Sequence, residues 1–204
     1  MTRAIPDVVV VDYGMGNLRN VARTLERAGA RPRVTTHPDE VRRADRLVVP
    51  GVGALGDMMR SLGEQGLVEA LRERVQDGRP YLGICLGMQV LFEESEEGSA
   101  RCLGVYPGKV TRFPDLPALP VPHMGWNSVE MTRQHPVLRG GFFYFVHGYR
   151  AAGVPTDRVL AYTDYGARFP SAVGFDACLA VQFHPEKSQR TGLRLLERFC
   201  VWRP

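Results

Sequence analysis

One cysteine in this sequence lies in a segment that is typical of a nucleophile. Cys85 stands in the run Gly83-Ile84-Cys85-Leu86-Gly87, with a glycine on each side of it. An apolar run precedes it and a helical pattern follows it, so we expect Cys85 at a sharp turn between a strand and a helix. Such a turn exposes the sulfur, and the N-terminus of a helix favours its thiolate form. Taken alone, the segment also fits a small buried cysteine without chemistry.

A base and an acid stand together later in the chain, in His184-Pro185-Glu186. The apolar run 179–183 predicts a strand that ends at the histidine, and Pro185 prevents further pairing. The imidazole of His184 can take the thiol proton, while Glu186 orients the ring and stabilises its charged form. The sequence therefore predicts Cys85, His184 and Glu186 as a catalytic triad.

A glycine-rich turn, Gly51-Val52-Gly53, follows the predicted strand 46–49. Ligands of parallel α/β sheets bind beyond the carboxyl ends of the strands, where this turn is expected. An N–H group of the turn and the N–H of Leu86 can hold the negative oxygen that forms when sulfur attacks a carbonyl group. In isolation, an ordinary glycine turn explains the segment equally well.

The pattern of apolar residues predicts the elements that must bring these segments together. In the N-terminal half, short β-rich runs alternate with helical runs, which indicates a parallel sheet with right-handed crossovers. We expect strands at 7–11, 33–36, 46–49 and 81–84, and helices at 18–28, 67–75 and 86–93. The acidic segment 93–97 is interpreted as a solvated helix end.

The C-terminal half is rich in β-forming residues and is punctuated by proline and glycine. We expect strands at 105–112, 142–146, 158–162 and 179–183, a helix at 192–202, and a loop at 121–136 with a short strand at 128–131. The predicted fold is α/β: one domain over residues 1–204, with a doubly wound, mostly parallel sheet, flanking helices and an additional β-rich C-terminal half.

Composition narrows the function classes. The 204 residues carry a formal net charge of +4, but only Lys109 and Lys187 are lysines and the arginines are scattered, so no nucleic-acid partner is expected. No apolar run is long enough to span a membrane, and the N-terminus does not resemble a secretion signal, so we expect a cytoplasmic protein. The four cysteines form no C-x-x-C pair, which predicts reduced thiols and no zinc site.

The cysteine turn, the glycine turn and His184-Pro185-Glu186 together resemble class I glutamine amidotransferases. Segments 11–18, 122–127 and 184–188 are similar to members of this family that deliver ammonia to a cyclase subunit in histidine biosynthesis. The resemblance covers nearly the whole chain. It implies that Cys85 attacks the side-chain amide of L-glutamine, that His184 protonates the departing ammonia, and that water hydrolyses the thioester to glutamate. It implies no metal and no organic cofactor.

The resemblance also implies contacts for substrate and partner. Gly53 and Gln89 match positions that hold glutamine, and Leu86 matches an oxyanion donor. Gly148 and Tyr149 are further candidate contacts, although the family usually has serine or threonine where this chain has Gly148, so only a backbone contact remains there. The candidate contacts with a cyclase subunit in a heterodimer are Asn17, Pro122, Met124, Trp126 and Lys187. Without the resemblance, the segment 122–127 fits a rigid apolar anchor and a loop folded into the core equally well.

Three other functions stay open at this point. A glutaminase that serves another acceptor, such as an anthranilate-type synthase, would share the triad and the glycine turn. A binding module can keep the fold without the reaction, because a fold alone does not establish function. A free-standing thiol hydrolase is the third. For a glutaminase with a partner, the position of Val52 between two glycines predicts that docking reorients this turn and switches hydrolysis on.

Overall fold

The computed structural model of this chain describes residues 5–117 and 119–204, and the larger of its two sheets contains nine strands. The strand order is β2-β1-β3-β4-β13-β12-β11-β8-β9. Strands β2 to β13 in this order are parallel, and the remaining neighbours are antiparallel. The parallel strands are β1 (Asp7–Val11), β2 (Arg31–Thr35), β3 (Leu47–Val49), β4 (Tyr81–Ile84) and β13 (Cys178–Val181).

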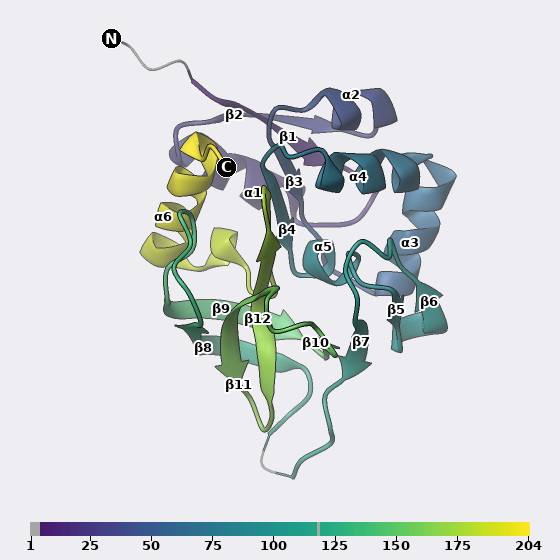
Figure 1. Cartoon of the computed structure of the whole chain (residues 1–204), viewed down its shortest axis with the longest axis vertical. Coiled ribbons are helices and arrows are strands. Elements are labelled where there is room, and N and C mark those ends of the chain that lie inside the picture. The colour runs from purple at the N-terminus through teal and green to yellow at the C-terminus, as the bar shows by residue number, and fades with distance from the viewer. Residues whose placement is uncertain (1–4, 118) are drawn as a thin grey trace.

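Helices cover both faces of the parallel strands, as Figure 1 shows. Alternate side chains of β1 enter opposite layers: Val9 and Val11 pack in the cluster under α2, α3 and α4, whereas Val8 and Val10 pack in the cluster under α1 and α6. This burial on both faces explains the continuous apolar run of β1. The helices are α1 (Leu18–Arg27), α2 (Pro38–Arg43), α3 (Leu55–Glu64), α4 (Leu67–Gln76), α5 (Leu86–Gln89) and α6 (Gln189–Val201). The predicted α/β fold is confirmed.

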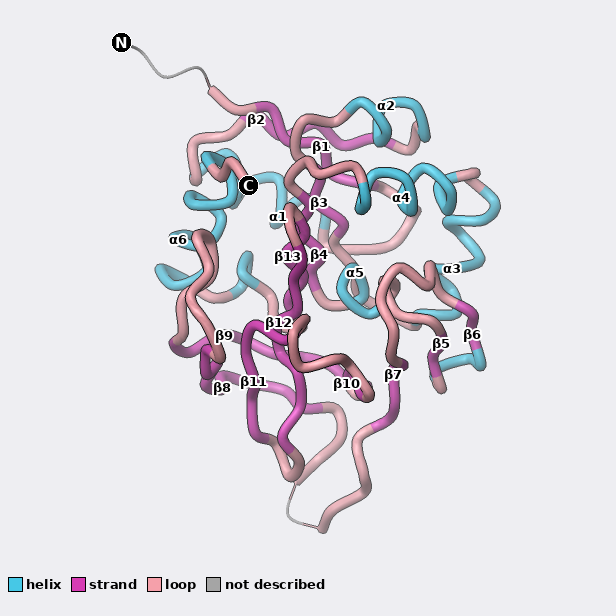
Figure 2. Tube along the Cα trace, in the orientation of Figure 1, coloured by secondary structure: helices cyan, strands magenta, loops and turns pink. Residues whose placement is uncertain are grey.

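The opposite end of the molecule consists almost entirely of strands and loops (Figure 2). Four antiparallel strands complete the large sheet: β8 (His123–Met131), β9 (Gly141–His147), β11 (Val159–Asp164) and β12 (Arg168–Phe175). A second sheet has the order β10-β7-β5-β6 and contains β5 (Glu94–Ser95), β6 (Ala100–Arg101), β7 (Lys109–Arg112) and β10 (Tyr149–Ala152). Within the large sheet, parallel pairing is therefore confined to the half around β1, β3 and β4, and the second sheet adds one parallel pair, β5 with β7.

Three local interpretations of the sequence were wrong. Helix α5 ends at Gln89 instead of residue 93, and the acidic segment 93–97 is not a helix end, because Glu94 and Ser95 pair with β7. Most of the expected loop 121–136 is strand β8. The part of β8 up to Ser128 pairs with only one strand, β9, so the sheet constrains the backbone less there and Gly125 is tolerated. The sequence did not predict helices α2 and α3 or strands β10 and β12.

The carboxyl ends of three parallel strands meet at one edge and position the chemistry. Strand β3 ends at Val49, directly before the glycine turn, and β4 ends at Ile84, directly before Cys85. The register of β13 on β4 pairs Val181 with Ile84, so the residues that follow both strands lie side by side. No helix in the described part of the chain is long and apolar enough to cross a membrane.

Candidate active site

The backbone at Cys85 is strained, and two glycines make this possible. Cys85 has φ of 54° and ψ of −106°, a region that side-chain-bearing residues rarely adopt. A Cβ on Gly83 would lie 2.2 Å from the Gly87 carbonyl oxygen, and one on Gly87 would lie 1.8 Å from the Val49 carbonyl oxygen. Glycine is therefore required at both positions for α5 to pack closely on the sheet. This geometry is a strand–turn–helix elbow with the cysteine at its apex.

His184 and Glu186 form a buried hydrogen-bonded pair beside this elbow. His184 Nδ1 donates to Glu186 Oε1 at 2.8 Å, and the two side chains are 1% and 2% exposed. Ser188 fixes the segment, because its hydroxyl donates to the His184 carbonyl and accepts the N–H of Tyr144 on β9. The second ring nitrogen, Nε2, has no hydrogen-bond partner among the described residues.

The charge state of His184 is set by Cys85 and Glu186. Burial alone would lower the pKa of His184, but Cys85 and then Glu186 raise the pKa to about 10. At neutral pH the ring therefore carries its proton and faces the sulfur as an imidazolium. A protonated imidazole next to a nucleophilic sulfur can deliver its proton to a leaving group.

A cavity of about 350 Å³ opens above Cys85 and contains most of the predicted substrate contacts. Its walls include Val52, Gly53, Leu86, Gln89, Gly148 and Tyr149. Gly51 lies behind the wall, and a Cβ there would come within 2.4 Å of the Leu86 Cβ, so only glycine brings the turn this close to α5. Asn17 and Lys187, predicted as partner contacts, line the same cavity, as do Glu97, Val146 and His147.

Gln182 belongs to this site and was missed in the sequence. It follows β13 and is fully buried. Its Nε2 donates to Cys85 Sγ at 3.5 Å, and its Oε1 accepts a hydrogen bond from Gln89 Nε2 at 2.9 Å. The available signal was a single polar residue inside an apolar run, because buried polar groups need hydrogen-bond partners.

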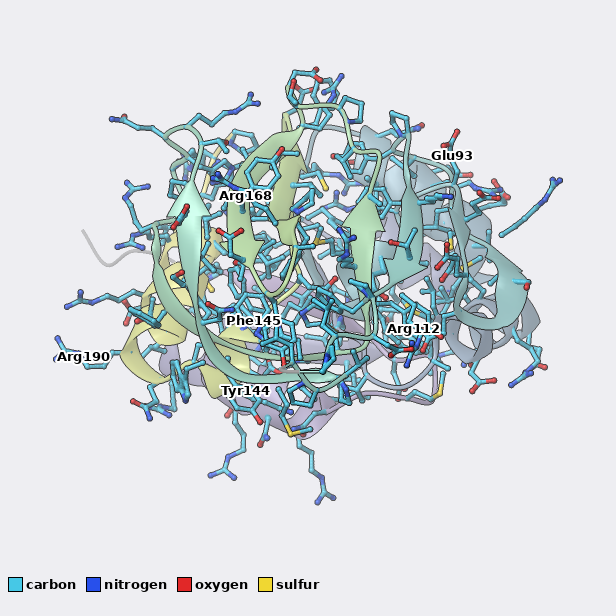
Figure 3. All side chains as sticks on the ribbon, turned by 90° about the horizontal axis from the view of Figure 1, so that it is seen from below. Glu93, Arg112, Tyr144, Phe145, Arg168 and Arg190 are labelled. Atoms are coloured by element: carbon cyan, nitrogen blue, oxygen red, sulfur yellow. The ribbon has the colours of Figure 1, made fainter. Side chains whose placement is uncertain are left out.

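One face of strands β8 and β9, which we call the β8/β9 face, is apolar and exposed. It consists of Met124, Trp126, Phe142, Tyr144 and Val146, which are cross-strand or diagonal neighbours. Met124, Trp126 and Phe142 are 62%, 46% and 64% exposed. Tyr144 and its neighbour Phe145 point to opposite sides of β9, and Phe145 is fully buried (Figure 3).

Four of the five predicted partner contacts lie on or next to this face, and the fifth, Asn17, lines the cavity. Met124 and Trp126 belong to the face, Pro122 is exposed just before β8, and the Lys187 ammonium lies 5.8 Å from the centre of the Tyr144 ring. Phe142 was not predicted as a contact and was placed only in the strand 142–146. Val146 connects the face to the cavity, because it pairs with Met124 and lines the space above Cys85.

A second buried histidine cluster lies beside the cavity. His147 Nδ1 donates to the Tyr149 carbonyl at 2.7 Å, and its Nε2 lies 3.2 Å from His123 Nδ1. Burial lowers the pKa of His147 to about 3 and that of His123 to about 4, so both rings are neutral. Among the described residues, no group of three or more histidine, cysteine or acidic residues is arranged to hold a metal ion.

Comparison with known proteins identifies the family. The model of the family "Glutamine amidotransferase class-I" matches residues 9–202. The chain is 46% identical over 210 residues to the imidazole glycerol phosphate synthase subunit HisH of Nitrosomonas europaea, covering 97% of this chain and 99% of that protein. It is 48% identical over 198 residues to the protein of the same name from Bacillus licheniformis, covering 93% of each.

Solved structures support the fold. A crystal structure of a glutamine amidotransferase superposes with a TM-score of 0.74 at 24% identity, covering 95% of this chain and 99% of the other. The structure of PurLQS from Thermotoga maritima gives a TM-score of 0.73 at 16% identity, covering 96% and 98%. These two likenesses concern the fold alone, whereas the family match and the curated relatives concern the sequence over nearly its full length. The chain belongs to the class I glutamine amidotransferases.

Proposed function

We propose that this chain is the glutaminase subunit of an imidazole glycerol phosphate synthase. It hydrolyses L-glutamine to glutamate and ammonia, and it delivers the ammonia to a cyclase subunit in histidine biosynthesis. The observation that carries the proposal is the strained Cys85 elbow, which lines the cavity and lies beside the buried pair of His184 and Glu186. Both relatives given above are named as the imidazole glycerol phosphate synthase subunit HisH, which supports the proposal.

The first half of the reaction uses the proton on His184. The Cys85 thiolate attacks the side-chain amide carbon of glutamine, and the carbonyl oxygen becomes negative. The N–H of Leu86 and an N–H of the glycine turn at Val52 or Gly53 hold this oxygen, and loss of one such donor typically costs about a hundredfold in turnover. His184 gives its Nε2 proton to the amide nitrogen, the C–N bond breaks, and ammonia leaves.

The second half restores the enzyme. With the sulfur bound in the thioester, His184 is neutral and its Nε2 accepts a proton from water as the water attacks the thioester carbon. The C–S bond breaks, glutamate leaves, and the thiolate and the imidazolium form again. Glu186 holds the Nδ1–H of the ring throughout, so that Nε2 faces the reacting atoms.

Gln89 is the proposed anchor for the substrate. Its Oε1 is buried and has no partner in the described part of the chain, so it is an unused acceptor at the cavity wall. The N–H donors of a bound glutamine can satisfy it. Gly53 leaves room for the substrate backbone, and Gly148 and Tyr149 offer the opposite wall.

The cyclase subunit is proposed to bind the β8/β9 face. Exposed apolar patches rich in aromatic residues are typical of protein interfaces. This face continues through Val146 into the cavity, and Asn17 and Lys187 line that cavity, so a partner seated here is next to the site where ammonia forms. Movement of the turn at Val52 on docking is the proposed means by which hydrolysis is switched on.

We propose the cytoplasm as the compartment of this enzyme and a single glutaminase domain over residues 1–204. Four free cysteines suit a reducing compartment. Cavity walls come from segments between Asn17 and Lys187, which supports one domain.

The proposal is tested by assembling the purified chain with the cyclase subunit and glutamine, then adding the nucleotide substrate of the cyclase. We expect glutamate production to rise on this addition, and Cys85→Ala to abolish glutamate production while the complex still forms. Glutaminase activity with an anthranilate-type synthase instead would show another acceptor. Binding without turnover would show a binding module, and cleavage of peptides or esters without glutamine turnover would show a thiol hydrolase.

A further inference from the structure

A buried chain of two side-chain amides connects the cavity wall with the sulfur of Cys85. Gln89 Nε2 donates to the Tyr149 carbonyl at 3.0 Å and to Gln182 Oε1 at 2.9 Å. Gln182 Nε2 in turn donates to Cys85 Sγ at 3.5 Å. Gln89 and Gln182 are 1% and 0% exposed, so neither amide exchanges these bonds for water. This series of hydrogen bonds reaches the sulfur without passing through His184 or Glu186.

The Tyr149 carbonyl group determines the direction of each hydrogen bond between Gln89, Gln182 and the sulfur. A backbone carbonyl only accepts, so the amide nitrogen of Gln89 must face Tyr149. The second hydrogen of that nitrogen goes to Gln182 Oε1, which turns Gln182 Nε2 toward the sulfur. Gln89 Oε1 is then left as an acceptor at the cavity wall, without a partner among the described residues.

We propose that Gln182 is a positioning residue for glutamine hydrolysis, a role that rests on the function proposed above. Its Nε2 stabilises the anionic sulfur of Cys85 before attack and when the thioester is released. Its Oε1 fixes the amide of Gln89 so that Gln89 Oε1 faces the N–H donors of the substrate. Gln182 thus couples nucleophile and substrate anchor through one rigid amide.

The backbone around Gln182 supports this role. The N–H of Cys85 donates to the Val181 carbonyl at 2.8 Å, and the N–H of Gln182 donates to the Ser171 carbonyl on β12 at 2.9 Å. The backbones of Cys85 and Gln182 are therefore both held by hydrogen bonds to strands of the sheet. A functional group on a rigid element with satisfied supporting bonds keeps its geometry better than one on a loop.

The side-chain type also fits the role. An amide donates at one end and accepts at the other without carrying charge. An apolar side chain of similar length would leave an N–H of Gln89 unpaired in the interior, and a carboxylate would repel the thiolate. Either loss is costly at a buried position.

The first test replaces Gln182 by methionine, which keeps similar length but removes both hydrogen bonds. We expect the rate of Cys85 alkylation by iodoacetamide at neutral pH, followed by mass spectrometry of the Cys85 peptide, to fall about tenfold. In the assembled complex, the KM for glutamine should rise about tenfold because Gln89 is no longer fixed. Ser171→Ala is the matched control. It removes a buried hydroxyl without a described partner from the neighbouring strand, and both readouts should stay within about twofold of wild type.

The second test replaces Gln182 by glutamate and measures kcat/KM relative to wild type across pH. A protonated Glu side chain can still donate to the sulfur and accept from Gln89, whereas a carboxylate can only accept and repels the thiolate. The ratio of variant to wild type should therefore fall about tenfold or more between about pH 5.5 and about pH 8.5. The titratable groups around this position are Cys85 after β4, His184 after β13, and His147 and Tyr149 from β9 and β10. They are shared by both proteins, so their own titrations largely cancel in the ratio.

These readouts separate the positioning role from a structural one. A uniform loss of activity in Gln182→Glu, with a flat ratio across pH, would overturn the proposal. Wild-type alkylation and KM in Gln182→Met would do the same, and if that variant fails to fold, the pH profile of Gln182→Glu decides alone. If the wild-type complex makes no glutamate, the proposed function fails, whereas the alkylation rate still reports the contact between Gln182 and Cys85.

Discussion

Two buried histidine groups lie near the same cavity, and one is protonated at neutral pH whereas the other is neutral. His184 contacts the carboxylate of Glu186 and is coupled to the sulfur of Cys85, and its pKa is raised to about 10. His147 and His123 contact each other, a backbone carbonyl and an amide, and burial lowers their pKa values to about 3 and about 4. All three side chains are almost fully buried.

The difference teaches that burial alone does not determine the charge of an imidazole here. Burial opposes the proton at all three rings, and only the ring next to Cys85 and Glu186 keeps it. The neutral rings form a one-way chain in which His123 Nδ1 donates to His147 Nε2, because His147 Nδ1 is occupied by the Tyr149 carbonyl. This difference fits the proposed role of His184 in proton transfer and a structural role of His123 and His147 at the cavity wall.

The largest expected effect comes from removing the charge that distinguishes the two clusters. Glu186→Gln keeps the size of the side chain but removes the carboxylate that holds the Nδ1–H of His184, so kcat of the complex should fall about a thousandfold or more. Steady-state glutamate production measures this. The reverse change, Asn127→Asp, puts a carboxylate next to His123 and should reduce kcat less than about tenfold. Equal losses in both variants would contradict the assignment of separate roles.

The next effect is a difference in titration. Histidine NMR of the chain should show His184 protonated well above neutral pH, and His147 and His123 neutral down to about pH 4. Cys85→Ala removes the neighbour that raises the pKa of His184 most, so the pKa of His184 should fall while the pKa values of the other two rings stay in place. If His184 titrates near pH 6.5 in the wild-type chain, its charge is not set by these neighbours.

The residues of the proposed triad could be selected from the sequence, since a cysteine between glycines and a histidine two residues before a glutamate are informative by themselves. It predicted the parallel half well, because strands buried on both faces read as apolar runs. Strand β12 was missed, and α3 was missed because Gly56 and Gly63 interrupt an otherwise helical spacing of apolar residues.

Contacts that depend on the register of paired strands could not be predicted. Gln182 reaches Cys85 only because β13 pairs with β4 in one register, and nothing in the local pattern reports that register. The exposure of Phe142 could not be predicted, because the spacing and type of apolar residues do not tell which face of a strand is covered. The pKa values of the two histidine clusters likewise depend on neighbours that are remote in the chain.

A smaller effect concerns stability in acid. The folded-state pKa of His147 lies below its ordinary value of 6.5, so its contribution to stability is present above about pH 6.5 and is lost as pH falls toward about 3. His147→Asn should therefore reduce the slope of unfolding free energy against pH in this window by about 1.4 kcal/mol per pH unit. Urea unfolding at several pH values measures the slope. His184→Gln is the control, because a ring protonated in both states below pH 6.5 adds no slope there. An unchanged slope in His147→Asn would mean that this ring is charged in the native state.

The smallest expected effect lies at Gly148, between the neutral cluster and the cavity. A Cβ at this position meets only Val121 Cγ1, at 3.6 Å, so a side chain fits without displacing the backbone. Gly148→Ser adds a hydroxyl to the cavity wall, and one new hydrogen bond to glutamine should lower KM about two- to fivefold with little change in kcat. Gly148→Ala adds the Cβ without the hydroxyl, so the difference in KM between the two variants isolates the hydrogen bond from the added volume. Equal KM values in the two variants would show that the substrate does not reach this wall, and the contact surface for glutamine would then be confined to Gln89, the glycine turn and the side of the cavity nearest His184.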